Sequence, residues 1–518
     1  MSEKSKLTKA AGIVGFATLI SRILGFIRDM VIAGFFGAGY TSDIFFVAFR
    51  IPNILRSLFA EGSLSVAFIP VFTGYITTDG KKSAFNLAQA VLIILSVILI
   101  IITILGIAGA PFIVKIVAPG FISYPDKIAR CIELTRIMFP YIFLIGIVGL
   151  CMGILNTLGH FAAPALAPVF LNLGMIAAVF ISQIIEIDPV NCLAYGVIAG
   201  GVLQLALQIP FIIKYKIPII KKPDIRHPGI EKIGKLMLPS IFGSAVYQIN
   251  IVIGTMFASL LPEGSVSYLY YADRLVQFPL GIFAIATATA LLPSLSRQAA
   301  VKDYKGLKKS FAYALKLILF ITLPAAAGLI VLKEPIVSLL FERGSFDAEA
   351  VKLTAYALLS YSIGLWAFSC VKITVSTFYS IKDTKTPVKI AAISIASNII
   401  LSFILMQFLS HSGLALANSL ASMINLTLLI IFLRKKIGRL GGGTILKSGI
   451  KSFISALIMG AFLYIFLFFI QTKSVITTMI IYKVGFLIIV GFIIYIAVSC
   501  ILNKDALKDV GRAIRKKG

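Results

Sequence analysis

Arginine residues inside apolar segments are the side chains of this sequence best suited to bind a ligand. Five of them fall within three stretches that are otherwise largely apolar: Arg22, Arg28, Arg50, Arg56 and Arg274. An arginine near the centre of a bilayer costs about 2.5 kcal/mol or more to insert, so a cost repeated this often predicts a water-filled cavity. Because a guanidinium binds phosphate oxygens through paired hydrogen bonds, the cavity would suit a phosphate or diphosphate.

Acidic residues close to these arginines decide how much positive charge remains. Four such acids stand in the same stretches: Asp29, Asp43, Glu61 and Asp273. If all were paired, the arginines would only hold helices together. We expect Asp29 to neutralise one neighbouring arginine, and we expect water at the membrane surface to compete at Asp43 and Glu61. A net positive charge would then remain in the cavity.

Helix geometry sets where two pairs of these arginines point. Arg22 and Arg28 are six residues apart, so on a regular helix they differ by about 240° and need not share a face. Arg50 and Arg56 flank Pro52, which removes a backbone donor and favours a kink that could turn both side chains toward a cavity.

The composition is that of a membrane protein. Of 518 residues, 59% are hydrophobic and only 13% are charged, and the mean hydropathy is +1.00. No soluble core could bury so much apolar surface, which excludes soluble enzymes, secreted proteins and disordered chains.

The apolar stretches predict an all-α polytopic protein with fourteen transmembrane helices. The first two stretches are less apolar than the rest because they carry Arg and Asp. The predicted helices cover 11–36, 42–76, 85–117, 128–157, 162–186, 192–215, 234–261, 267–293, 310–333, 349–380, 386–410, 412–433, 448–471 and 475–502.

Lysine and arginine are distributed very unequally between the two sides of the membrane. With this set of spans, thirty-two fall on one side and six on the other. Cytoplasmic loops carry the excess of Lys and Arg, so both termini are predicted to be cytoplasmic. This topology accounts for the formal charge of +27, and we expect no nucleic-acid partner.

Recurring prolines and glycines predict an internal repeat. Pro70 matches Pro293 and Pro164 matches Pro387, each at an offset of 223 residues. We therefore expect two homologous six-helix lobes, 1–222 and 223–437, followed by 438–518 with the last two helices and a basic tail. Six is an even number, so the lobes form a parallel repeat with a pseudo-two-fold axis along the membrane normal, as in carriers with alternating access.

Cysteine and histidine predict no metal site and no cofactor. The five Cys and three His are scattered without metal-ligand spacing. The sequence also shows no pairing of a nucleophile with a base, so we do not expect an enzyme and expect no catalytic residues.

Three segments carry a family resemblance: SRILGFIRD, TSDIFFVAFRIPNILRSLFAEGSLSVAFIPVF and SYLYYADRLVQFPLGIFAIATATALLPSLS. They resemble the MurJ (MviN) family of lipid II flippases, within the MATE-like multidrug/oligosaccharidyl-lipid/polysaccharide superfamily, and the likeness spans the chain. It implies transfer of lipid II, an undecaprenyl-diphosphate-linked disaccharide-pentapeptide, from the inner to the outer leaflet of the bacterial cytoplasmic membrane for peptidoglycan synthesis.

The resemblance also assigns roles to residues and partners. The family's essential cavity arginines fall on Arg22, Arg28, Arg56 and Arg274, and its important acids on Asp29 and Asp43. Helices 448–471 and 475–502 are expected to form a groove for the polyprenyl tail. Lipid II, membrane lipids and cell-wall synthesis enzymes are the expected partners.

Some alternatives stay open. A flippase for another polyprenyl-diphosphate-linked saccharide would use the same arginine chemistry, whereas a MATE-type drug or cation antiporter would need more intramembrane acids. A scaffold for cell-wall enzymes would not need the arginines. Coupling to a monovalent cation or to the membrane potential is undecided, because 239–261, where relatives have an acid at a sodium site, contains no Asp or Glu.

Overall fold

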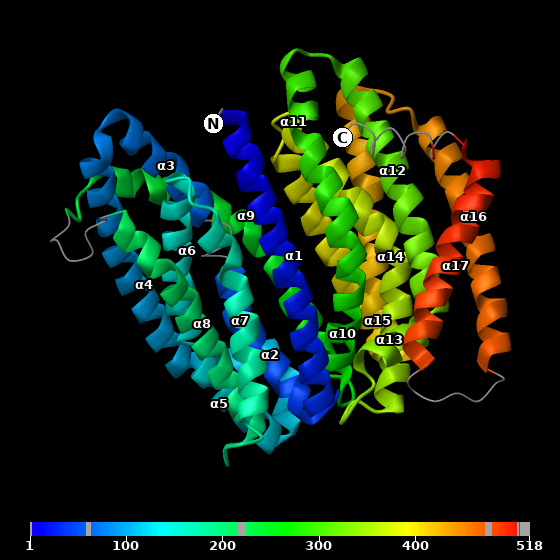
Figure 1. Cartoon of the computed structure of the whole chain (residues 1–518), viewed down its shortest axis with the longest axis horizontal. Coiled ribbons are helices and arrows are strands. Elements are labelled where there is room, and N and C mark those ends of the chain that lie inside the picture. The colour runs from blue at the N-terminus through cyan, green and yellow to red at the C-terminus, as the bar shows by residue number, and fades with distance from the viewer. Residues whose placement is uncertain (1–2, 58–63, 216–223, 472–478, 505–506, 508–518) are drawn as a thin grey trace. The chain divides into compact units, whose positions relative to one another are not determined.

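A computed structural model describes residues 3–57, 64–215, 224–471, 479–504 and 507. All the regular secondary structure in these ranges is helical, as the sequence predicts (Figure 1). The chain divides into two compact units, residues 1–266 and 267–518. Each unit is described by itself.

The first unit contains nine α-helices and one short 3-10 helix in the described residues. They are α1 (Glu3–Phe36), α2 (Tyr40–Arg56), α3 (Leu64–Thr78), α4 (Gly80–Val117), η2 (Pro119–Ser123), α5 (Pro125–Met138), α6 (Tyr141–Thr157), α7 (Ala162–Ile181), α8 (Pro189–Lys214) and α9 (Pro228–Ser259).

Proline and side-chain caps explain where several of these helices begin. α5, α8 and α9 each start with a proline, whose missing N–H costs nothing at the first helical position. Asp188 accepts a hydrogen bond from the Val190 N–H at 2.9 Å and so caps α8. These signals fix the helix starts even where the flanking turns are apolar.

Glycines allow α7 and α8 to pack with their backbones nearly in contact. A Cβ atom on Gly174 would lie 2.8 Å from the Gly196 carbonyl oxygen and 2.8 Å from the Gly200 Cα. Small residues at such crossings are typical of membrane helix pairs, because association there depends on close van der Waals packing. α1 in turn packs against α7, which places the first helix next to this rigid pair.

The second unit continues with α10 (Ser265–Pro279), the π-helical turn η3 (Leu280–Ile285), α11 (Ala286–Ala300), α12 (Tyr304–Val331), α13 (Lys333–Phe341), α14 (Ala348–Ser380), α15 (Lys385–Ile437), α16 (Gly442–Gln471) and α17 (Met479–Leu502). α14 packs against α11, α12, α13 and α15 and forms the centre of this unit.

The last two helices, orange and red in Figure 1, lie side by side and pack on α12. Phe320 of α12, Leu463 of α16 and Leu487 of α17 belong to one buried apolar cluster. Tyr495 of α17 donates a hydrogen bond to the Phe320 carbonyl at 2.7 Å, which satisfies its hydroxyl inside the cluster.

The structure corrects several predicted helix boundaries. The predicted helix 42–76 consists of α2 and α3, and the segment between them lies outside the described residues. The predicted helix 128–157 is interrupted at Phe139 and Pro140, between α5 and α6. The predicted helix 267–293 contains the π turn η3. By contrast, the predicted boundary between helices 386–410 and 412–433 is confirmed, because the continuous element α15 is two helices joined at a kink at Ser410 (φ 52°, ψ −135°).

Ten helical stretches in the described residues are long and apolar enough to cross a membrane. α1 and α2 are not among them, in agreement with their predicted lower hydropathy, and only the short Gln248–Ser259 part of α9 is strongly apolar. The protein is therefore an all-helical, multi-pass membrane protein.

Candidate functional site

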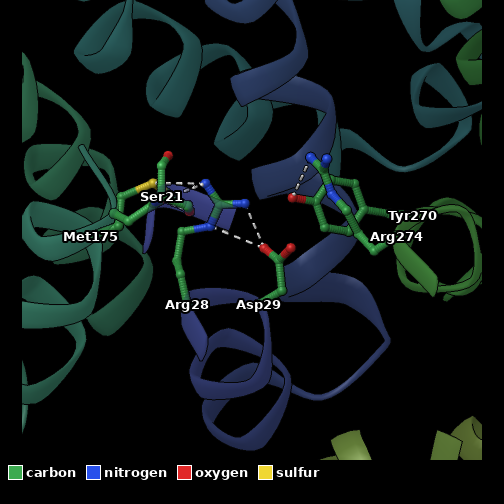
Figure 2. Close-up of polar contacts among 7 residues, drawn as sticks. Ser21, Arg28, Asp29, Met175, Tyr270 and Arg274 are labelled. Carbon is green, nitrogen blue, oxygen red and sulfur yellow. Dashed lines mark hydrogen bonds and ion pairs between the residues drawn. The ribbon is translucent and has the colours of Figure 1, made fainter. Parts of the chain in front are cut away.

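The best-defined charged cluster of the first unit joins α1 to α7. The Arg28 Nη2 atom lies 2.7 Å from Asp29 Oδ1, and Arg28 Nε donates to the same oxygen at 3.0 Å. Arg28 Nη1 donates to Asn172 Oδ1 at 3.0 Å, and Figure 2 shows the Arg28 guanidinium beside Asp29. Arg28 and Asp29 are 7% and 2% exposed. The predicted neutralisation of an arginine by Asp29 is thus confirmed.

Asn172 was not predicted to belong to the site, yet it holds the cluster together. Its Oδ1 accepts from Arg28 while its Nδ2 donates to the Ser21 carbonyl at 3.1 Å. Gly25 of α1 lies at this contact, where a Cβ would be in ordinary van der Waals contact with Asn172 Nδ2, at 3.6 Å. One amide thereby fixes both the Arg28 side chain and the α1 backbone. An isolated Asn in an apolar stretch gives no sequence signal for this role.

Arg22 lies on a different side of α1 from Arg28. It is exposed, whereas Arg28 is buried, as the predicted 240° separation requires. Among the described residues Arg22 has no hydrogen-bond or ion-pair partner. A ligand could therefore meet the charge of Arg22 without displacing a contact among the described residues.

Arg274 of the second unit has an aromatic neighbour. Its Nη2 donates to the Tyr270 hydroxyl at 3.0 Å, and the guanidinium carbon lies 4.7 Å from the centre of the Tyr270 ring (Figure 2). Such a cation–π contact orients a guanidinium plane without neutralising its charge. Asp273, the neighbouring acid, accepts from Gln277 Nε2 at 3.4 Å.

The remaining predicted arginines lie on α2, which continues as a helix through Pro52. Arg56 Nε donates to Asn53 Oδ1 at 3.0 Å, and both Arg50 and Arg56 are half-buried. Glu61 lies outside the described residues, so its predicted pairing with α2 is not described by the structure.

Asp43 differs most from expectation. It is 2% exposed rather than surrounded by water. Asp43 Oδ2 forms an ion pair with Lys127 Nζ at 3.3 Å and accepts from the Gly264 N–H at 2.8 Å. Glu263 accepts from the Tyr40 N–H at 2.7 Å beside it. Lys127 lies in the loop between the predicted helices 85–117 and 128–157, yet it is buried beside Asp43, and its Nζ lies 4.5 Å from the centre of the Phe121 ring.

These contacts join the start of α2, the α5 region and the segment after α9 within the first unit. A buried carboxylate with a lysine and a backbone donor is a tie between helices, and its charge is balanced locally. Asp43 is therefore better suited to hold this end of the unit together than to tune a ligand site.

No metal-binding group of three or more His, Cys, Asp or Glu occurs in the described part of the chain. The side chains that could bind a ligand here are guanidinium groups. Arg28 is held in place and charge-balanced, Arg22 is exposed, and Arg274 is half-buried and oriented by the Tyr270 ring. Such donors bind anions and hold no reacting group of their own.

Comparison with known sequences identifies a family. The profile described as "Lipid II flippase MurJ" matches residues 32–485. A protein of Vibrio cholerae named "Probable lipid II flippase MurJ" is 41% identical over 432 residues, 82% of each chain. A "Lipid II flippase MurJ" of Burkholderia cenocepacia is 38% identical over 424 residues, 81% of this chain and 82% of that protein.

Comparison with solved structures agrees. A "Lipid II flippase MurJ, inward closed conformation" has a TM-score of 0.80 at 28% identity and covers 95% of this chain and 99% of that one. An inward-facing multidrug resistance MATE family transporter has a TM-score of 0.66 at 17% identity, with 83% and 98% of the two chains covered. The latter likeness concerns the fold alone.

Proposed function

The chain belongs to the MurJ family of lipid II flippases, and on this basis we propose that it moves lipid II from the inner to the outer leaflet of the bacterial cytoplasmic membrane. The family match over residues 32–485 carries the proposal. A flippase is a transporter, so the chain needs substrate-binding groups and no catalytic residues. Lipid II, whose undecaprenyl chain is joined through a diphosphate to its disaccharide-pentapeptide, is the substrate.

The proposed layout has fourteen spans with both termini in the cytoplasm. Two six-helix lobes, 1–222 and 223–437, form a parallel repeat, and alternating access follows from their rocking. Residues 438–518 add the last two helices, whose outward apolar side chains suit a polyprenyl tail; Phe469 and Phe492 are 67% and 65% exposed. Exposed aromatic side chains on membrane helices support contact with hydrocarbon.

We assign the diphosphate to the arginines, because a guanidinium matches phosphate oxygens in geometry and charge. Arg22, Arg28, Arg56 and Arg274 are the proposed binding residues. Arg50 and the acids Asp29, Glu61 and Asp273 adjust the local charge, whereas Asp43 holds one end of the first unit together. The fixed Arg28 side chain supports this role, since a donor held in place loses little entropy when it binds. Arg28 and Asp29 together are neutral, so Arg28 can bind an anion without trapping it.

The first experiment is complementation of a bacterium depleted of its own lipid II flippase, with lipid II in the outer leaflet assayed directly. We expect wild-type protein to restore outer-leaflet lipid II, and Arg28→Ala and Arg274→Ala to fail at equal membrane abundance. Arg226→Ala, an exposed arginine outside the proposed site, is the matched control and should restore it.

Loss of Arg28 removes the ion pair of the buried Asp29 carboxylate, which costs about 3–5 kcal/mol and could prevent the protein from accumulating. Arg28→Lys keeps the charge and separates this effect from a binding role. A well-expressed wild type that restores nothing would indicate another polyprenyl-diphosphate glycan. Rescue by every variant would support the flippase function. It would also show that these arginines pair within the protein and are not needed to bind the diphosphate.

A further inference from the structure

The start of α9 is capped by a histidine. His227 stands directly before α9, and its Nδ1 atom accepts a hydrogen bond from the Gly229 N–H at 3.1 Å. Nδ1 must therefore be unprotonated, which places the proton of a neutral ring on Nε2. Ser, Thr, Asp and Asn are the usual residues at this position, and none of them becomes a cation.

The same ring is buried between two neighbouring helices of the first unit. His227 is 9% exposed. Its ring centre lies 4.8 Å from that of Tyr75 on α3, in an edge-on arrangement, and its Nε2 lies 3.5 Å from Ser83 Oγ on α4. The cap of α9 is thus also its contact with α3 and α4.

The backbone next to the cap is equally close to these helices. A Cβ on Gly229 would lie 2.8 Å from the Leu87 side chain and 3.0 Å from Tyr75. The α9 backbone can pack here only because residue 229 is a glycine and the cap keeps its N–H turned inward. Loss of the hydrogen bond at Gly229 would therefore loosen the packing as well as the helix end.

The charged groups around the ring are mainly basic. α9 and the residues before it contribute Asp224, Arg226, Glu231, Lys232 and Lys235, and the α3–α4 turn with the start of α4 contributes Asp79, Lys81 and Lys82. α3 contributes Tyr75, and the Lys232 Nζ lies 5.4 Å from the centre of its ring. Glu231 is engaged with Lys235 at 2.5 Å, and the Asp224 carboxylate accepts from the Arg226 N–H at 3.0 Å.

We propose that His227 is a pH-sensitive latch that holds the start of α9 against α3 and α4 when neutral and releases it when protonated. A proton on Nδ1 turns the acceptor into a donor facing the Gly229 N–H. The positive end of the α9 dipole also disfavours a cation at the cap. Because protonation of the ring is the event that breaks the cap, a fall in pH on the side of the membrane that carries the start of α9 is the trigger.

Release would act on a helix that is also held farther along. Gln248 Nε2 donates to Ser57 Oγ of the residue following α2 at 2.8 Å, and the Gly120 N–H donates to Ser259 Oγ at 3.1 Å. With these intact, only the part of α9 before Pro239 loses its contacts. The latch goes beyond the proposed transport function and is tested without a transport assay.

Hydrogen–deuterium exchange of the full-length protein in lipid nanodiscs tests the latch. Protection of the amides of residues 229–238 is compared at about pH 7.5 and about pH 5.5, after correction for intrinsic exchange. We expect wild-type protection in this segment to fall about fivefold or more at the lower pH, the effect of losing a helix cap. His227→Asn, with a cap that does not titrate, should keep its protection at both values.

Two further variants make the result decisive. His227→Ala should lose protection in this segment at both pH values, whereas His160→Asn, which removes another histidine that contacts the Phe211 ring, should retain the wild-type response. Equal wild-type protection at both pH values would overturn the proposal. So would a pH response that persists in His227→Asn, because another group would then be responsible.

Discussion

Arg28 shows how a membrane helix can carry a strong anion donor at low cost. A lone arginine in hydrocarbon is expensive, but this one is already hydrogen-bonded to Asp29 and Asn172. The Arg28 guanidinium is therefore held in a single geometry before a ligand binds. The unneutralised charge is instead on Arg22, which is exposed on the same helix.

Asn172 is the residue whose loss should best show this positioning. Asn172→Leu removes the hydrogen bonds to Arg28 Nη1 and to the Ser21 carbonyl, a loss of about 1–3 kcal/mol in total. We expect a lower unfolding temperature in detergent and weaker restoration of outer-leaflet lipid II. Asn191→Ala, whose amide contacts the exposed Glu133, should change neither by a comparable amount. A fully active, equally stable Asn172→Leu protein would contradict the role.

Asp383, in the turn between α14 and α15, gives a pH-dependent prediction outside the membrane. Burial opposes its ionisation, but hydrogen bonds from Lys436 and Thr386 outweigh burial and lower the pKa to about 2. An unfolded aspartate titrates near 3.9. The folded state thus gains stability from the carboxylate at neutral pH and loses it progressively as the pH falls from about 4 to about 2.

Asp383→Asn should accordingly unfold at a lower temperature than wild type at pH 7, and the difference should disappear near pH 2, as followed by thermal unfolding in detergent. Glu231→Gln serves as the control. Its exposed pairing with Lys235 also lowers the pKa of the carboxyl, yet full exposure to solvent should leave the unfolding temperature unchanged. A difference at Asp383 that is independent of pH would exclude the ion pair as its cause.

At the scale of elements, hydropathy identified where apolar helices lie and missed where they break. The mean hydropathy of 128–157 does not register the interruption at Phe139 and Pro140, and the proline does not mark it, because Pro70 and Pro111 lie inside helices that continue. The π turn η3 cannot be recognised in the hydropathy either, because it changes backbone hydrogen bonding and not composition.

In the candidate site, too, one contact could be predicted from the sequence and another could not. The pairing of Arg28 with Asp29 could be predicted because the residues are adjacent. The pairing of Asp43 with Lys127, 84 residues apart, could not, because it depends on the packing of α2 against α5. For the same reason, a predicted loop lysine proved to be buried.

Packing between α7 and α8 provides a prediction at this scale. Gly174→Ala would place a methyl group 2.8 Å from the α8 backbone, so the helices must separate or shift. We expect a clear fall in the unfolding temperature. Gly254→Ala, in a helix where nothing lies within 4 Å of the new Cβ, should leave it unchanged or slightly raised, since alanine favours helix. Equal stability of the two variants would show that the α7–α8 crossing tolerates separation.

At the scale of the whole molecule, the distribution of charge and apolar surface fits a chain that is solvated by lipid. Large apolar side chains such as Phe112 and Phe408 are 69% and 79% exposed, as only a hydrocarbon solvent permits along long helices. The basic residues collect in the connections predicted to be cytoplasmic. The proposed parallel repeat then requires positions 223 or 224 residues apart to face the same side of the membrane.

Cysteine labelling tests this requirement directly. In a variant lacking the five native cysteines, we would introduce Lys82→Cys and Lys305→Cys as one pair, and Tyr124→Cys and Ala348→Cys as the other, all at exposed positions. We expect a membrane-impermeant maleimide to label residues 124 and 348 in intact cells, and residues 82 and 305 only after the membrane is opened. Both pairs labelled with the opposite sidedness would reverse the topology and retain the repeat. A pair whose two members lie on different sides would rule out a parallel repeat, because equivalent turns of two lobes that enter the membrane in the same direction cannot be separated by it.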